Sequence, residues 1–449
     1  MAKQLFGTDG IRGVAGEFPL DATTAHAVGA VLGEWASKAQ PGAEVVIGMD
    51  TRESGPWLAA QVEGGLARLG VSSRFAGLIT TPGVAWLTRT GPFVAGVMIS
   101  ASHNLYQDNG IKIFDHSGFK LPDAVEHMLE ERVFALLDET IQPAPADLIV
   151  DQGLDQQYID FLAGAFDGSL DPVSLVVDCA NGAASHLAPE LFQRLGARVV
   201  AMACAPDGRN INRDCGALHV EGLRRRVLAE RADAGFAFDG DADRAILVSA
   251  QGRIVDGDAV LLVAGRAMLE RGALHDHTGQ PAVVATVMSN LALERAFHRL
   301  GIRMPRTPVG DRYVIEEMRR CGANLGGEQS GHIIFRDDST TGDGLLTALR
   351  VLGIMRRTGA GLDELTRDLE LYPQRLVNVP VQSRSPLEKL AAVSREIRAA
   401  EQAFGDAGRV LVRFSGTEPL ARVMVEGPDI LRVELFASRI AGAIRAELG

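Results

Sequence analysis

The sequence contains few cysteines, and none is placed as a metal site or a disulfide framework requires. The four cysteines among 449 residues, Cys179, Cys204, Cys215 and Cys321, are scattered and form no CxxC pair. This distribution suggests neither a cysteine-based zinc site nor a disulfide framework, and it fits a reducing compartment.

Basic residues are also fewer than acidic residues. The chain carries 45 Lys and Arg against 57 Asp and Glu, a formal net charge of −12. A nucleic-acid-binding surface needs clustered Lys and Arg, so we expect no nucleic-acid partner. A small anionic substrate held by a few arginines stays compatible with this charge.

Signals for export and for membrane insertion are missing as well. The opening MAKQLFGTDGIRG has no continuous apolar segment of the signal-peptide type. The apolar stretch 259–269 contains Arg266 and is too short to span a bilayer. We therefore expect a cytoplasmic protein without a membrane partner. A chain of 449 residues exceeds one hydrophobic core, which predicts two to four domains.

A repeated pattern indicates three related α/β domains. The tripeptide Arg-Leu-Gly ends at Gly70, Gly196 and Gly301, each time after a strand-like run and a helix-like segment. The glycine suits a left-handed helix C-cap, and strand–helix–strand order predicts a parallel pair with a right-handed crossover. The strand-like runs are 44–49, 174–178 and 282–287, and the following extended segments are 71–75, 197–202 and 302–305. Any α/β protein repeats this order to some extent. The alternative is therefore that the three segments are not related to one another.

Downstream of each copy, a second apolar strand runs into a polar, glycine-bearing loop. The three segments are 96–104 (GVMISASHN), 235–244 (GFAFDGDADR) and 323–332 (ANLGGEQSGH). In parallel α/β sheets, ligands bind beyond the carboxyl ends of the strands. We therefore expect each domain to present one loop of distinct chemistry to a shared central cleft.

The predicted fold class is α/β, with three domains of mainly parallel mixed sheets and a small C-terminal α+β domain. After Pro373 the repeat stops, and the pattern predicts a strand (376–381), a helix (386–404), a hairpin (409–425) and a helix (430–448). The predicted domains are 1–148, 149–252, 253–370 and 374–449.

The DGDADR loop predicts a metal site. Asp239, Asp241 and Asp243 alternate, so three hard carboxylate oxygens can converge on one cation if the loop curls. An EF-hand would need Gly at its sixth position and Glu at its twelfth, where this chain has Arg244 and Ala250. An acidic surface turn is the remaining alternative. The oxygen ligands favour magnesium.

The ASHN loop offers Ser102 as a nucleophile. His103 is adjacent, but neighbouring side chains of an extended backbone point apart, which argues against a Ser–His pair. Lys112 is the better candidate for handling protons, since burial can lower the pKa of a lysine. Taken alone, this segment fits an ordinary turn or helix-cap serine better than a nucleophile.

Two further loops suit a phosphorylated sugar. Glu328 and Ser330 lie two residues apart, so that both can contact vicinal hydroxyls, although a helix cap is an equal alternative. In RFSGTEPLAR, the amides around Ser415, Gly416 and Thr417 can cradle an anion. Arg413 and Arg422 flank them and can bind phosphate oxygens. A plain hairpin is the alternative there. Arg12 in FGTDGIRG is a further cation.

These motifs, in this order and along essentially the whole chain, resemble the alpha-D-phosphohexomutase family. FGTDGIRG and GEQSGH resemble its glucosamine-phosphate branch, whereas the branches acting on mannose and glucose phosphates usually carry GEMSGH. One departure stands out. The family usually has proline after SHN, where this chain has Leu105, so the stiffness of the loop is in question.

The resemblance implies a role for each motif. Ser102 would be a phosphoserine, and one Mg²⁺ per chain would be held by the phosphoserine oxygen with Asp239, Asp241 and Asp243. Glu328 and Ser330 would bind sugar hydroxyls. The other groups would act near the transferring phosphoryl group (Arg12, Lys112, Arg244, His332) or bind the substrate's second phosphate (Arg413, Ser415, Gly416, Thr417, Arg422).

The activity implied is the reversible conversion of glucosamine 6-phosphate to glucosamine 1-phosphate through a bisphosphate intermediate. This reaction would supply UDP-N-acetylglucosamine and cell-wall precursors. The partner would be a small phosphosugar, and the family's bacterial members suggest a homodimer. A mannose- or glucose-phosphate mutase is the alternative enzyme, and a non-catalytic phosphosugar-binding protein is the alternative outside catalysis.

Overall fold

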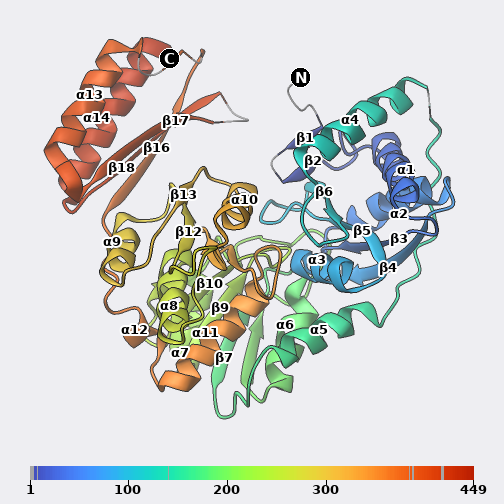
Figure 1. Cartoon of the computed structure of the whole chain (residues 1–449), viewed down its shortest axis with the longest axis horizontal. Helices are drawn as coiled ribbons and strands as arrows, with labels where there is room; N and C mark the ends of the chain where they lie inside the picture. The colour runs from blue at the N-terminus through green and yellow to red at the C-terminus, as the bar shows by residue number, and fades with distance from the viewer. Residues whose placement is uncertain (1–4, 8, 140, 384, 387–388, 416–418) are drawn as a thin grey trace. The chain divides into compact units, whose positions relative to one another are not determined.

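The computed structural model describes residues 5–7, 9–139, 141–383, 385–386, 389–415 and 419–449. The chain folds into two compact units (Figure 1). The first contains residues 1–288 and 301–367, and the second contains residues 289–300 and 368–449.

The first sheet of the first unit has the strand order β1-β2-β6-β5-β3-β4. Its strands are β1 (Phe6–Gly7), β2 (Gly10–Val14), β3 (Glu44–Met49), β4 (Ser72–Leu78), β5 (Phe93–Ile99) and β6 (Asp108–Asp115). The helices of this part of the chain are α1 (Ala22–Ala39), α2 (Gly55–Ala67), α3 (Thr81–Thr90) and α4 (Asp123–Asp138). Strand β3 pairs in parallel with β4 and β5, whereas β6 is antiparallel to β5.

Two more sheets follow in the same unit, with the orders β11-β10-β9-β7-β8 and β13-β12-β14-β15. The second sheet contains β7 (Ser174–Asp178), β8 (Arg198–Met202), β9 (Ala234–Phe238), β10 (Ala245–Ser249) and β11 (Ile254–Val255). The third contains β12 (Val283–Thr286), β13 (Arg306–Thr307), β14 (Leu325–Gly327) and β15 (Ile333–Phe335). The helices are α5 (Leu154–Gly164), α6 (Ala184–Arg194), α7 (Glu221–Glu230), α8 (Gly257–Glu270), α10 (Asp311–Cys321), α11 (Gly344–Thr358) and α12 (Leu362–Leu365).

All three sheets contain the same four-strand pattern, which confirms the predicted repeat. The central strands β3, β7 and β12 each have two parallel neighbours. A fourth strand, β6, β10 or β15, then returns antiparallel to the last of them. The repeat glycines have the expected positive φ, 69° at Gly70, 96° at Gly196 and 72° at Gly301. Each of the three polar loops therefore joins a parallel strand to an antiparallel one.

The third copy departs from the prediction after its glycine. Residues 302–305 were expected to be the second strand, but β13 lies at Arg306–Thr307. Only Arg303 forms an isolated bridge, with Ala282. Pro305 has no N–H for a strand ladder, which explains why regular pairing begins after it.

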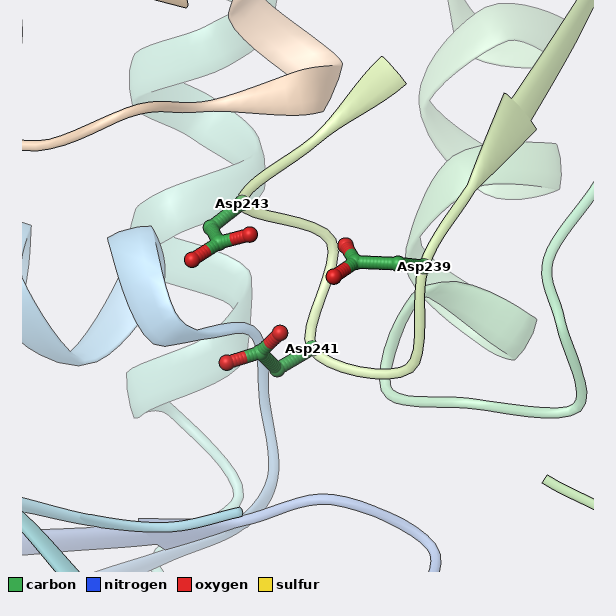
Figure 2. A group of neighbouring side chains, drawn as sticks. All are labelled: Asp239, Asp241 and Asp243. Atoms are coloured by element: carbon green, nitrogen blue, oxygen red, sulfur yellow. The ribbon is translucent and has the colours of Figure 1, made fainter. Parts of the chain in front are cut away.

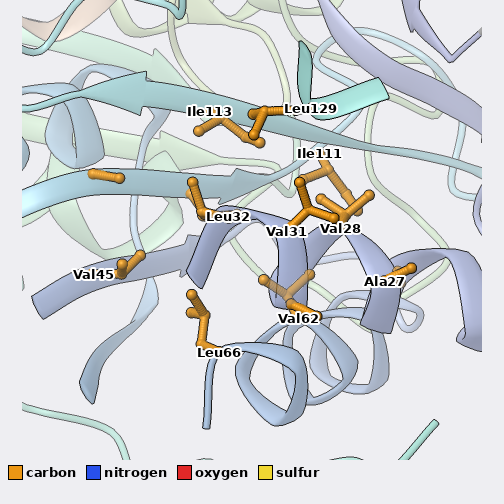
Figure 3. Packing of buried hydrophobic residues seen from close by; sticks show 14 of the residues in the cluster. Ala27, Val28, Val31, Leu32, Val45, Val62, Leu66, Ile111, Ile113 and Leu129 are labelled. Carbon is orange, nitrogen blue, oxygen red and sulfur yellow. The ribbon is translucent and has the colours of Figure 1, made fainter. Parts of the chain in front are cut away.

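An extensive core cluster lies around the first sheet. Val28, Val31 and Leu32 of α1 pack among residues of α2 and of β6, including Val62 and Ile111 (Figure 3). The apolar face of α1 is thus covered on two sides, which fixes the sheet whose β5–β6 loop carries Ser102. Among the described residues, no helix combines the length and apolarity that crossing a membrane requires.

The second unit is built on the antiparallel sheet β16-β18-β17. Its elements are α9 (Leu291–Arg299), β16 (Gln374–Pro380), α13 (Ala391–Phe404), a 3-10 helix (Gly405–Ala407), β17 (Arg409–Phe414), β18 (Leu420–Glu426) and α14 (Ile430–Leu448). Helix α14 begins and ends as predicted, whereas α13 begins at Ala391 rather than at residue 386. Residues 289–300 join this unit, where the Leu291 N–H donates to Glu426 at 2.8 Å. The four domain boundaries stay predictions.

Candidate active site

Ser102 is buried in the turn between β5 and β6 and is directed at the aspartate loop. Its hydroxyl donates to Oδ2 of Asp239 at 2.7 Å, and its own N–H donates to the Ser100 hydroxyl at 2.9 Å. The φ angle of Ser102 is +54°, a left-handed conformation that is uncommon for a residue with a side chain. The structure therefore brings Ser102 next to the aspartate loop, but its backbone is not extended as expected.

This backbone conformation corrects the expectation for His103. Because Ser102 is left-handed, the adjacent side chains do not point apart, and Nδ1 of His103 lies 3.3 Å from the Ser102 hydroxyl. Burial, followed by the Arg244 and Arg12 guanidinium groups, lowers the pKa of His103 to about 4. The imidazole is thus neutral at pH 7. Because the Ser102 hydroxyl donates its one hydrogen to Asp239, the hydrogen of the His103 contact belongs on Nδ1, which then donates to Ser102.

The three aspartates converge as predicted. Asp239, Asp241 and Asp243 lie in the turn from β9 to β10, and one oxygen from each can be chosen so that all three lie within 4.8 Å of one another (Figure 2). All three are buried, which excludes an acidic surface turn. Since strands flank the loop on both sides, the helix–loop–helix of an EF-hand is excluded as well.

Three clustered carboxylates without a cation repel one another. The pKa of Asp239 is raised to about 8, mainly by burial and further by the negative charges of Asp243 and Asp241. Within the described part of the chain, Oδ1 of Asp241 and Oδ1 of Asp243 are buried without a hydrogen-bond partner. Buried polar atoms are normally satisfied, so two orphaned carboxylate oxygens beside a third carboxylate fit a divalent cation.

Lys112 reaches this cluster from β6, but its pKa is shifted opposite to the prediction. Its ammonium group donates to Asp241 at 2.8 Å and lies 3.3 Å from Asp9 and 3.9 Å from Asp243. Burial opposes the charged form, yet Asp241 and Asp9 outweigh it and raise the pKa of Lys112. Lys112 is therefore a cation in this state, able to donate a proton rather than to accept one.

Asp9 is a site residue that the sequence reasoning missed. It accepts from Arg12 and Lys120 and lies beside Lys112, so it holds three cations together. Lys120 also pairs with Asp311, at the start of α10. The available signal was the position of Asp9 three residues before Arg12 in FGTDGIRG.

Arg12 and Arg244 lie on either side of these carboxylates. Arg12 Nη1 is 3.4 Å from the Ala101 carbonyl, and Arg244 Nε is 3.7 Å from Asp243 Oδ1. The Nε atoms of both arginines are buried and have no hydrogen-bond partner in the described chain. Burial lowers the pKa of both arginines, but the neighbouring carboxylates outweigh burial and raise it. Each can therefore contribute positive charge to an incoming anion.

The GGEQSGH loop joins β14 to β15 and lies against the aspartate loop. The Ala245 N–H donates to the Gly331 carbonyl at 3.1 Å. Glu328 accepts the Gly310 N–H at 3.1 Å. The Ser330 hydroxyl is buried and has no partner among the described residues. Gly310 is the N-cap residue of α10, so Glu328 binds the N–H at the start of that helix, and the helix-cap alternative stays for this residue.

His332 has both ring nitrogens engaged. Its Nδ1 lies 3.5 Å from Asp243, and its Nε2 accepts the Gly342 N–H at 3.0 Å. Burial lowers the pKa of His332, but Asp243 outweighs burial and raises it. A proton on Nε2 would face the Gly342 N–H, so we assign the neutral ring with its hydrogen on Nδ1, directed at Asp243.

The predicted phosphate-binding residues belong to the second unit. Arg413 of β17 and Arg422 of β18 are register partners, and Ser415 is buried. Burial and Arg422 lower the pKa of Arg413. Like charges directly opposite in a sheet destabilise it unless an anion lies between them. Gly416 and Thr417 lie outside the described residues.

Comparison with known proteins defines the class. Models of phosphoglucomutase/phosphomannomutase alpha/beta/alpha domains I, II and III match residues 3–139, 156–252 and 256–372, and the model of the C-terminal domain matches 376–443. The chain belongs to this family of alpha-D-phosphohexomutases, which are isomerases that act by phosphoryl transfer.

Individual relatives extend this result. The chain is 61% identical to phosphoglucosamine mutase of Solibacter usitatus over 100% of both chains. It is 50% identical to phosphoglucosamine mutase of Koribacter versatilis over 100% of this chain and 98% of that one. A solved phosphoglucomutase/phosphomannomutase family protein from Burkholderia thailandensis is 25% identical, with a TM-score of 0.80 over 98% of this chain and 97% of that one. The predicted family and fold class are confirmed.

Proposed function

We propose that the chain interconverts glucosamine 6-phosphate and glucosamine 1-phosphate through a phosphorylated Ser102. The observation that carries the proposal is the 2.7 Å contact from the Ser102 hydroxyl to Asp239, one of three buried, clustered carboxylates. A serine beside a cation site can carry a phosphoryl group whose charge the cation offsets. The relatives named phosphoglucosamine mutase, with identities up to 61%, support the choice of sugar.

The proposed chemistry consists of two phosphoryl transfers. In the first, the bond from phosphorus to Ser102 Oγ breaks, a bond to the free sugar hydroxyl forms, and the hydroxyl proton ends on Ser102. The bisphosphate then turns over, and its other phosphate returns to Ser102. When bound by Asp239, Asp241, Asp243 and a phosphoserine oxygen, Mg²⁺ would supply the positive charge that phosphoryl transfer needs.

The chain's own residues would do the remaining work. Lys112, Arg12 and Arg244 carry positive charge beside the cluster and would stabilise the transferring group. A neutral His332 beside Asp243 would add a hydrogen-bond donor. Protonated Lys112 would stabilise the departing Ser102 oxygen by its charge, while that oxygen receives the proton of the sugar hydroxyl.

Recognition of the sugar and of the second phosphate is proposed from the loops. The Ser330 hydroxyl lacks a partner in the described chain, as a group reserved for a sugar hydroxyl would. Glu328 would accept a neighbouring hydroxyl. Arg413, Ser415 and Arg422, with Gly416 and Thr417, would bind the phosphate that is not transferred.

A coupled assay with glucosamine 6-phosphate, with and without Mg²⁺, tests the proposal. We expect turnover that requires Mg²⁺ and is lost in Ser102→Ala, and a phosphoryl adduct on Ser102 by intact-mass analysis. Retained turnover in Ser102→Ala would refute the phosphoserine route. Higher kcat/KM on mannose or glucose phosphates would assign another sugar within the same family.

A further inference from the structure

Two buried side chains from different sheets bind the main chain of the Ser102 loop. Arg52, which follows β3, donates from Nη2 to the Ser102 carbonyl at 3.2 Å and to the Asn104 carbonyl at 2.6 Å. Its Nε donates to the Asp108 carbonyl at 2.8 Å, and its Nη1 pairs with the buried Asp50. One guanidinium therefore spans the loop from Ser102 to the first residue of β6.

Asn212, which lies between β8 and α7, binds the same two carbonyls. Its Nδ2 donates to Ser102 at 2.9 Å and to Asn104 at 2.8 Å. An amide nitrogen has two hydrogens, so both are used on this loop. Each of the two carbonyls receives one donor from Arg52 and one from Asn212, which satisfies both lone pairs of each oxygen.

The loop has hydrogen bonds of its own, such as that from the Asn104 amide to Asp108 at 2.8 Å, but none of them binds the Ser102 carbonyl. Ser102 has a φ of +54°, a left-handed conformation that is unfavourable for a residue with a side chain. Position 105 carries leucine, whose φ is free, and this residue is 52% exposed. A strained conformation persists only where its surroundings determine it.

We infer that Arg52 and Asn212 are positioning residues that hold Ser102 in the left-handed conformation from which its hydroxyl reaches the aspartate cluster. The inference rests on the proposed role of Ser102 as the phosphorylated nucleophile. Both half-reactions need this oxygen at one place. The two residues act through the carbonyls and do not touch the reacting atoms.

The variants Asn212→Gly and Asn212→Asp test this inference. Asn212 has a φ of +58°, which glycine adopts without strain and aspartate tolerates. Glycine removes both donors, and aspartate keeps the size but presents acceptors to two carbonyls. Asn324→Gly is the matched control, since buried Asn324 also donates twice from Nδ2, to Ala273 at 2.9 Å and to Asp337 at 2.7 Å.

Two measurements test whether Asn212 positions Ser102. Hydrogen–deuterium exchange of residues 101–107 should accelerate by about tenfold in both Asn212 variants and not in the control. In the coupled assay, kcat should fall by about 10- to 100-fold while KM changes by less than about threefold, because misplacing a reacting atom affects the transition state rather than ground-state binding. A merely structural role would lower kcat equally in the control.

The inference is overturned if loop exchange or kcat in both Asn212 variants equals that of the unsubstituted protein. If the unsubstituted protein turns over none of the hexose phosphates, the proposed function fails, and the exchange measurement still decides whether Asn212 holds the loop. The variant Arg52→Lys should weaken the support of the loop only in part. Lysine keeps a charge beside Asp50 but cannot reach three carbonyls, so intermediate exchange is expected.

Discussion

Replacing Tyr158 with phenylalanine removes one hydroxyl next to a buried carboxyl group in the first unit. Tyr158 and Asp343 are 0% and 2% exposed, and the hydroxyl donates to Oδ2 of Asp343 at 2.7 Å. The other oxygen accepts the Leu346 N–H at 2.9 Å and caps α11. Burial raises the pKa of Asp343 to about 6, while the two donors limit the rise.

The sign of the pH dependence follows from this shift. The folded-state pKa lies above the ordinary value of 3.8, so Asp343 favours folding below about pH 4, and this contribution is lost as the pH rises through 6. A shift of about two units corresponds to about 3 kcal/mol. Tyr158→Phe removes a bond to a charged acceptor at pH 8, worth about 1.5–3 kcal/mol. At pH 5 the acceptor is largely neutral, and the loss should be about 1 kcal/mol.

Urea unfolding at pH 5 and pH 8 measures this difference. The phenyl ring should stay in place, because the Tyr158 ring packs beside both Trp86 and Phe161, with centroid distances of 6.2 and 6.3 Å. Tyr313→Phe is the control. Its hydroxyl has no hydrogen-bond partner within the described chain, so the change should stay within about 0.5 kcal/mol. A loss for Tyr158→Phe that is equal at the two pH values, or larger at pH 5, would refute the reasoning.

Three further substitutions probe the site. Asp241→Asn should weaken Mg²⁺ binding by at least about tenfold in calorimetry, because it removes one of three charged ligands; unchanged affinity would place the metal elsewhere. Gly240→Ala should lower turnover by at least about tenfold, since a Cβ there would lie 2.4 Å from the Ser102 carbonyl; normal kcat would contradict this close contact. Leu105→Pro should leave kcat within about threefold and raise stability by up to about 1 kcal/mol; a large loss of activity would show that the loop needs a flexible residue there.

Much of the fold could be predicted from the sequence because the signals are local. The repeat glycines and apolar runs gave the parallel strand pairs and their order, and the bounds of β3, β7 and α14 agree with the structure. Alternating aspartates predicted the cluster, since a tight turn between two strands brings every second side chain together. Mixed sheets were expected, but the antiparallel fourth strands were not assigned to particular residues; β15, for example, has only three residues, too few to show a period.

What the sequence did not give depends on distant residues. The pKa of Lys112 was expected to fall with burial, but Asp9 and Asp241, far away along the chain, reverse its direction. The conformation of Ser102 likewise depends on Arg52 and Asn212, which the sequence gives no reason to connect with it. Local patterns identify chemical groups, whereas their charge state and orientation are set by tertiary contacts.

The antiparallel return strand after each polar loop has a consequence for how such proteins diversify. Each loop is held at both ends by a ladder of backbone hydrogen bonds, to which its own side chains contribute nothing. The residues of one loop can therefore change while the sheet persists. Loss of the serine or of the aspartates would leave a folded protein without catalysis. The fold can therefore be inherited without the activity, because each loop can change on its own.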